Sequence, residues 1–362
     1  MAAVGKPGRK LLKVLGAVLG AVLLLAVVAW AASREVRYVT RAAFEEALIL
    51  ARRRPIAKVV ADPATDAATR GKLELVLAAR GFAAESLHLA ARRTYTTYSR
   101  IDRDTLVLVV SASPVDRLVP YLWYYPVVGR VPYKGFFDLA GAEAEAARLR
   151  RMGLDTYVRV SDAFSTLGWF EDPLLSTIVG ADSVDLAATV IHEILHNTIW
   201  VPGNVPFNES LADFVGYRGA ERFFLSRGDR RSAAFAAARW QDEIRLSHFY
   251  DSLAATLDRL YASHPAGEAL EAERQRVFAA ARAALADSVG RTLRTIDGRR
   301  LAQRPLNNAV VVAARFYRTD LDRFEALLAS DGGDIVRAIA DLGRRAASGD
   351  PWAPAPRQAA RP

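Results

Sequence analysis

The chain has 362 residues, of which 51% are hydrophobic, and this combination excludes a protein that is disordered throughout. It contains no cysteine, which excludes disulfides, a thiolate nucleophile and a cysteine-ligated zinc site. The formal net charge is +9, but arginines alternate with acidic residues along most of the chain, which argues against a nucleic-acid partner. Any bound metal ion must therefore be held by imidazole and carboxylate groups.

The first 33 residues carry the clearest topological signal. An uncharged apolar run from Val14 to Ala32 is about long enough to cross the hydrocarbon core of a membrane as a helix. Basic residues precede this run, and they favour the cytoplasmic side: Lys6, Arg9, Lys10 and Lys13. Residues 1–33 are therefore predicted to be a retained signal anchor, or a signal peptide that is removed near Ala29-Trp30-Ala31. Either alternative sends the rest of the chain across the membrane.

The remainder of the chain is predicted to be α+β and predominantly helical. Apolar residues recur every three or four positions between residues 38 and 90, which predicts helices that are interrupted at Pro55. Three short apolar runs predict a small β-sheet, at residues 105–111, 127–133 and 156–160. Residues 182 to about 345 again have a helical pattern, and residues 347–362 are typical of a disordered tail. We expect one domain over residues 34–346.

The residues Ile191-His-Glu-Ile-Leu-His196 fit the pattern H-E-x-x-H within an apolar segment, Ser183 to Trp200, that is predicted to be a buried helix. Four residues advance a helix by little more than one turn, so His192 and His196 can direct both imidazoles at one metal ion. Glu193 is turned by about 100° from His192, which suits a general base acting on water and not a ligand. Metal ligation would also compensate the cost of burying these polar groups.

A second motif follows the helix-breaking residues Trp200-Val-Pro-Gly-Asn204. A further helix is predicted from Phe207 to about Phe224, and Glu209 and Asp213 share one face of it because they are four residues apart. The short connection predicts that the two helices are antiparallel neighbours. The second helix can then bring one carboxylate to the metal and another to the back of a ligand imidazole.

These two motifs resemble those of thermolysin-like zinc peptidases with a glutamate third ligand. Their second motif has the form N-E-x-x-x-D, which Asn208-Glu209-Ser-Leu-Ala-Asp213 matches. The resemblance implies that Glu209 is the third zinc ligand, that Asp213 supports His192, and that Asn208 lies near the substrate backbone. One feature departs from the pattern, because only twelve residues separate His196 from Glu209. A class with a third histidine is excluded, since Pro202 occupies the position at which that histidine would be required.

The part of the chain after the apolar run also resembles a bacterial family of putative zinc aminopeptidases found mainly in proteobacterial envelopes. The similarity lies in the two zinc motifs and in three further segments, Tyr124–Gly129, Tyr133–Asp138 and Ala163–Thr177. This resemblance implies a zincin-like fold, a Zn²⁺ cofactor and a peptide substrate. It also implies a location at the bacterial inner membrane with a periplasmic catalytic domain, or in the periplasm if the signal is cleaved.

Three further features have two interpretations each. Ser165, Thr166, Leu167 and Gly168 can form an edge strand that pairs with a peptide substrate, or an ordinary turn. Tyr317, in a helix opened by Asn307-Asn308, can donate to the oxyanion, although an N-cap and a core tyrosine are the simpler interpretation. The third is a cluster of aromatic residues that can form a core layer or a binding surface: Tyr121, Trp123, Tyr124, Tyr125, Tyr133, Phe136 and Phe137.

Two functions follow from these observations. The first is a zinc-dependent envelope peptidase, an aminopeptidase by its family resemblance, in which Glu193 accepts the proton of a zinc-activated water. The second is a zinc-organised factor that binds peptides without cleaving them. Glu193 favours the enzyme, because a structural zinc needs no base and fills its fourth position with a protein ligand.

Overall fold

The computed structural model describes residues 8–101, 107–125, 129–161, 173–263 and 267–352. Its internal contacts divide the chain into two units, Met1–Arg52 and Arg53–Pro362. The sequence placed the start of the main domain at residue 34, and the contacts place the division one helix later.

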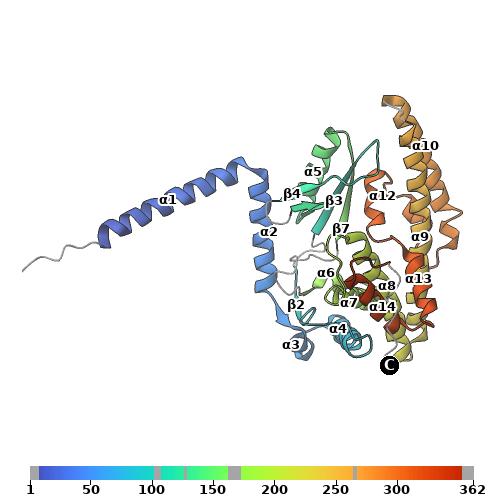
Figure 1. Ribbon diagram of the computed structural model, residues 1–362. Coiled ribbons are helices and arrows are strands. Elements are labelled where there is room, and N and C mark those ends of the chain that lie inside the picture. The colour runs from blue at the N-terminus through green and yellow to red at the C-terminus, as the bar shows by residue number, and fades with distance from the viewer. Residues whose placement is uncertain (1–7, 102–106, 126–128, 162–172, 264–266, 353–362) are drawn as a thin grey trace, which may run out of the picture. The chain divides into compact units, whose positions relative to one another are not determined.

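The first unit consists of the helices α1 (Gly8–Ala32) and α2 (Arg34–Ala51), both blue in Figure 1. Ser33 separates them, and its hydroxyl caps α2 by accepting a hydrogen bond from the Val36 N–H at 3.3 Å. Among the described residues, Lys13–Ala32 is the one helical stretch that is long and apolar enough to cross a membrane, a property that signal sequences share.

The second unit is mostly helical. Its larger helices are α4 (Ala67–Glu85), α5 (Leu139–Arg151), α7 (Ser183–Leu195), α8 (Val205–Ser226), α9 (Arg230–Ala262), α10 (Gly267–Ala286), α12 (Asn308–Arg315), α13 (Leu321–Ser330) and α14 (Ile335–Ala347). Its short helices are α3 (Ile56–Ala61), α6 (Ser176–Val179), η1 (Gly290–Thr292) and α11 (Gly298–Ala302). Its strands are β1 (Arg54–Pro55), β2 (Thr97–Ser99), β3 (Val107–Pro114), β4 (Trp123–Tyr125), β5 (Gly129–Val131), β6 (Lys134–Phe136), β7 (Leu154–Ser161) and β8 (Leu174–Leu175).

The sheet that matters most for the site has the strand order β6-β3-β7, with β3 antiparallel to both neighbours. Helix α5 packs on β3 and β7 from one side and α12 packs on them from the other (Figure 1). This double cover explains why β3 is a continuous apolar run, since both of its faces are buried. The register of the central pair sets Arg159 of β7 opposite Val109 of β3.

Helices α7 and α8 form the centre of the helical layer, and α4 and α9 pack against them. Small residues of α8 allow this close approach. A Cβ atom on Gly216 would lie 2.9 Å from the Ala188 carbonyl oxygen of α7, and one on Gly219 would lie 3.1 Å from the Ile191 side chain. The backbones of the two helices that carry the H-E-x-x-H and N-E-x-x-x-D motifs are therefore in near contact.

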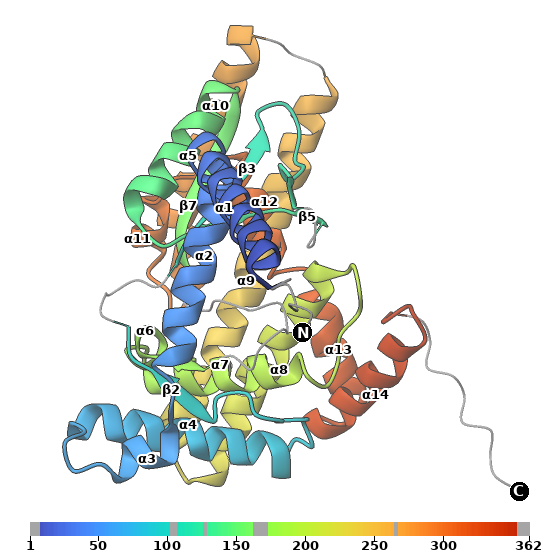
Figure 2. The same cartoon turned by 90° about the vertical axis from the view of Figure 1, so that its left-hand side faces the viewer.

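Helices α13 and α14 lie beside α8 (Figure 2). Phe214 of α8 stacks on Phe324 of α13 with ring centroids 5.4 Å apart. Trp352, beyond α14, contacts the rings of Phe207 and Phe324 at 5.8 and 4.8 Å. Trp352 falls within the tail expected from residue 347, so ordered packing extends further than the sequence suggested.

The predicted α+β and predominantly helical class is confirmed, because the second unit is mostly helical and contains small sheets. The three predicted strand regions correspond to β3, β5 and β7, and the break at Pro55 falls in β1. The aromatic cluster divides between the two interpretations. Trp123 and Phe137 are buried in the core, whereas Tyr124 is 71% exposed and Tyr133 is 42% exposed.

Candidate functional site

Helix α7 holds both histidines, and it ends earlier than the sequence suggested. The Asp182 carboxylate caps its first turn by accepting from the Val184 N–H at 2.7 Å. The helix was predicted to reach Trp200 but ends at Leu195, because residues 196–198 form turns that lead into the break at Pro202. His196 caps the C-terminal end with helical backbone angles, so it still lies about one turn beyond His192.

Helix α8 starts two residues earlier than predicted and presents Glu209 in its second turn. The Asn204 side chain caps it by accepting from the Phe207 N–H at 3.2 Å. Asn208 fixes the connection between α7 and α8, since its amide accepts from the Val201 N–H and donates to the Val201 carbonyl, both at 2.9 Å. The short connection between the two helices is thus held by the Asn204 cap of α8 and by the two hydrogen bonds of the Asn208 amide.

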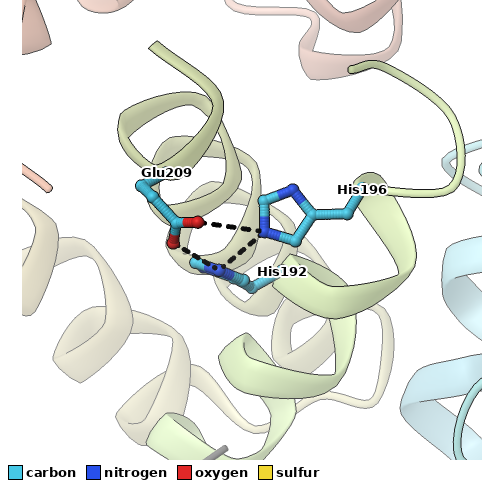
Figure 3. Close-up of side chains that lie close together, drawn as sticks. All are labelled: His192, His196 and Glu209. Carbon is cyan, nitrogen blue, oxygen red and sulfur yellow. Dashed lines mark hydrogen bonds and ion pairs between the residues drawn. The ribbon is translucent and has the colours of Figure 1, made fainter. Parts of the chain in front are cut away.

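The side chains of His192, His196 and Glu209 converge on one point between α7 and α8 (Figure 3). Their potential ligand atoms all lie within 4.8 Å of one another. The two Nε2 atoms are 3.2 Å apart, and the Glu209 carboxylate oxygens lie 3.5 Å from His192 Nε2 and 3.9 Å from His196 Nε2. All three side chains are largely buried, with exposed fractions of 13 to 19%.

These separations can be compared with the requirement of a metal ion. Ligands bound to zinc at about 2.0–2.1 Å in a tetrahedral arrangement lie about 3.3 Å from each other. The observed distance of 3.2 Å is slightly shorter than this value, and those of 3.5 and 3.9 Å are longer. Two imidazoles and one carboxylate also form the donor set of a catalytic zinc site that keeps a fourth position for water. The residues present therefore fit Zn²⁺.

The three side chains strongly influence one another's pKa values. Burial lowers the pKa of His192, but the Asp213 and Glu209 carboxylates outweigh it and hold that pKa well above the usual value. Burial and the neighbouring His192 lower the pKa of His196 to about 4. Burial raises the pKa of Glu209, yet its hydrogen bond and charge interaction with His192 bring it below the usual value. A metal ion bound through His192 Nε2 would take the place of the proton that this raised pKa favours.

Asp213 supports the site from the side opposite the convergence point. Its carboxylate accepts a hydrogen bond from the His192 Nδ1–H at 2.9 Å, which leaves Nε2 directed toward His196 and Glu209. A carboxylate behind a ligand histidine fixes its tautomer and ring orientation. Burial raises the pKa of Asp213, and the positive charge of His192 opposes that shift.

Glu193, the expected general base, is half-buried on α7 directly after His192. Its charge contributes to the raised pKa of His192, so its carboxylate lies within electrostatic reach of that ring. This position is compatible with a base that acts on a water molecule beside the three converging groups.

Three side chains that lie far apart in the sequence also interact electrostatically with Glu209. Burial and the Glu209 charge raise the pKa of Tyr317, and the same two causes raise the pKa of Tyr133, which is only partly buried at 42% exposure; the positive charge of Arg159 opposes the shift in each. The same arginine contributes to the lowered pKa of Glu209. Arg159 Nη2 lies 3.5 Å from the Tyr317 hydroxyl. The sequence pattern singled out Tyr317 but not Arg159, which is the one basic residue of β7 and lies between Val158 and Val160.

The loop between α12 and α13 positions Tyr317. Helix α12 ends at Arg315, so Tyr317 follows this helix and is not part of it as predicted. The Thr319 N–H donates to the Ser210 hydroxyl at 2.9 Å, which ties the loop to the residue after Glu209. The Ser247 hydroxyl donates to the Arg318 carbonyl at 3.0 Å, which ties it to α9. Asn307 caps α12, as the simpler interpretation held.

The remaining predicted substrate contacts have different outcomes. Asn208, predicted to lie near the substrate backbone, is only 1% exposed, and its amide forms hydrogen bonds with the Val201 backbone. Ser165, Thr166, Leu167 and Gly168 lie outside the described residues. Trp200, which the sequence did not single out, is 51% exposed and contacts the His196 ring edge to face at 5.5 Å.

Comparison with protein families gives one match, a family described as "Putative aminopeptidase", whose model matches residues 37–350. The chain belongs to this family. The match includes His192, His196, Glu209 and Asp213, and the family's description indicates peptidase activity. No curated protein and no solved structure matched the chain in the corresponding comparisons.

Proposed function

We propose that the protein is a zinc-dependent peptidase whose metal is held by His192, His196 and Glu209. The observation that carries this proposal is the convergence of two imidazole nitrogens and a carboxylate from adjacent helices at separations suited to one zinc ion. Zinc bound there would lower the pKa of a water molecule toward about 7 and polarise the scissile carbonyl.

Glu193 and Asp213 have separate tasks in this proposal. Glu193 accepts the proton of the attacking water and then passes it to the leaving amine, which gives hydrolysis without a covalent enzyme intermediate. Asp213 keeps the His192 ring in one tautomer through its 2.9 Å hydrogen bond. Tyr317 remains protonated because burial and Glu209 raise its pKa, so its hydroxyl is available to donate to the developing oxyanion.

The N-terminal helix supports a location at the bacterial inner membrane. Lys13–Ala32 has the length and hydropathy of a membrane-spanning helix, and basic residues precede it. The peptidase unit is then periplasmic, anchored by a retained helix or released after cleavage. A peptide substrate follows from the family, and aminopeptidase action is the form of hydrolysis that its description suggests.

The replacement Glu193→Gln tests the proposal. It keeps the three ligands and most of the shape of the site, and it removes the group that accepts the proton. Hydrolysis of a peptide library, read by mass spectrometry, is expected to fall by roughly 10² to 10⁴, while zinc content stays near that of the wild type. Glu273→Gln is the matched control, because Glu273 is an exposed glutamate on α10.

The alternative function, peptide binding without turnover, makes a different prediction. If zinc-loaded wild-type protein and the Glu193→Gln variant bind the same peptides and neither cleaves any, the protein is a zinc-organised binding factor. Equal cleavage by both proteins would show that Glu193 is not the base.

A further inference from the structure

Arg159 is a cation whose position in the fold is unusual. It lies on β7, in a sheet covered by helices on both faces, and its neighbours Val158 and Val160 are apolar. Its guanidinium lies 3.5 Å from the Tyr317 hydroxyl and 5.7 Å from the centroid of the Tyr317 ring. The arginine therefore shares the neighbourhood of the loop that reaches toward the metal-binding side chains.

That loop connects Arg159 to the site. The Thr319–Ser210 hydrogen bond holds the loop against α8 immediately after Glu209. Arg159 Nη2 lies 3.5 Å from the hydroxyl of Tyr317, which precedes Thr319 by two residues in the same loop. The guanidinium is therefore connected, through Tyr317 and its loop, to the residue that follows Glu209.

Arg159 forms no close ion pair with a carboxylate among the residues that the structure describes, and its guanidinium lies beside the Tyr317 hydroxyl instead. Three other arginines with little exposed surface do form such ion pairs: Arg218 with Glu325, Arg274 with Asp155, and Arg318 with Glu243. A guanidinium carries five N–H donors in a planar fork that matches a carboxylate. Arg159 therefore has the capacity to bind an anion that the described part of the chain does not supply.

The charges of the site decide which end of a peptide this arginine suits. The carboxylates of Glu193, Glu209 and Asp213 are assigned above to proton transfer, metal binding and support of His192. A substrate ammonium group would be repelled by Arg159, whereas a carboxylate would be attracted and could accept two parallel hydrogen bonds. We propose that Arg159 binds a carboxylate of the peptide substrate, either the C-terminus of a short peptide or the side chain of an acidic residue.

This inference rests on the proposed peptidase function and names its substrate class. The test uses zinc-loaded full-length protein in detergent and matched peptides that differ only in one charge. One pair is tetra-alanine with a free or an amidated C-terminus. The other pairs are amidated tetra-alanine peptides with Glu or Gln at each position in turn. Wild-type protein is expected to cleave the carboxylate form of at least one pair about ten- to a hundred-fold more efficiently, measured as kcat/KM.

Replacement of Arg159 should remove this preference. In Arg159→Gln the ratio of kcat/KM within the preferred pair is expected to fall to near one, and Arg159→Lys should keep part of it because charge remains without the fork. The matched control is Arg276→Gln, since Arg276 is an exposed arginine of α10 at 72% exposure, and it should retain the full ratio. A merely structural role for Arg159 would change both members of a pair alike and leave the ratio intact.

Binding separates this proposal from the peptidase proposal. Calorimetry with the same peptide pairs and the zinc-loaded Glu193→Gln protein measures carboxylate preference without turnover. Selective binding together with an inactive wild type would refute the peptidase and keep the carboxylate site. The inference is overturned if the wild type shows no preference within any pair, in cleavage or in binding, or if Arg159→Gln retains the preference. The pair that responds identifies the source of the carboxylate, C-terminal or side chain.

Discussion

Gly216→Ala tests how closely the two metal-binding helices approach each other. Gly216 lies on α8, two turns after Glu209, and an added Cβ would lie 2.9 Å from the Ala188 carbonyl oxygen and 3.4 Å from the His192 Cβ. Carbon atoms do not normally approach a backbone oxygen this closely, so the helices must separate by a few tenths of an ångström. The substitution therefore disturbs the spacing between His192 and Glu209 as well as the packing of the core.

The magnitude follows from two opposing contributions. Alanine in place of glycine within a helix stabilises it by about 0.5–1 kcal/mol. Insertion of a methyl group into a packed interface costs about 1–3 kcal/mol. The net effect of Gly216→Ala should be a loss of roughly 0–2.5 kcal/mol in the free energy of unfolding. Gly81→Ala is the matched control, because Gly81 lies within α4 and has nothing within 4 Å of a built Cβ. It should stabilise by about 0.5–1 kcal/mol.

Two measurements check this prediction on the full-length protein in detergent. Urea unfolding of the metal-free protein, followed by tryptophan fluorescence, gives the change in stability for each variant. Zinc titration gives the change in metal affinity, which should decrease about tenfold for Gly216→Ala, as for other residues that position a ligand, and stay unchanged for Gly81→Ala. A Gly216→Ala protein that is as stable as the wild type and binds zinc equally well would refute the close approach of α7 and α8.

Three further predictions concern other parts of the chain. Metal analysis should show no stoichiometric zinc binding in each of the ligand variants His192→Ala, His196→Ala and Glu209→Ala. Asp213→Ala should weaken zinc binding by about ten- to a hundred-fold. Full zinc retention by the Glu209 variant would mean that another carboxylate completes the site. Burial and the neighbouring Asp182 raise the pKa of Asp185 to about 6. Between about pH 4 and pH 6 the folded state therefore binds more protons than the unfolded state. The free energy of unfolding consequently falls as pH rises through this range. Unfolding titrations should therefore show wild type losing stability relative to Asp185→Asn up to about pH 7, and a difference that is constant with pH would contradict the shift. Alkaline phosphatase fused to the C-terminus should be active if the second unit is periplasmic, whereas activity of a cytoplasm-only reporter at that position would reverse the topology.

The sequence by itself was sufficient for features that depend on neighbours along the chain. The i, i+4 spacing of His192 and His196 places them on one helix face whatever the rest of the fold does. Because the connection after His196 is short, α8 returns beside α7, and this brings Glu209 near both histidines. The same locality explains why the apolar run at the N-terminus and the helical character of residues 182–345 could be predicted.

Only the tertiary structure decided the features that depend on strand register and helix packing. Arg159 approaches Tyr317 because β7 pairs with β3 in one register while α12 packs across both strands, and no local pattern encodes that combination. Asn208 matched a motif position near substrate, yet the Val201 backbone engages its amide in the turn between α7 and α8. The apolar pattern also predicted a helix that is longer than α7, because apolar residues continue to Trp200 whereas the helix ends at Leu195. Sequence spacing fixes which side chains share one helix face, whereas contacts between distant segments form only when burial of the whole core sets their relative positions.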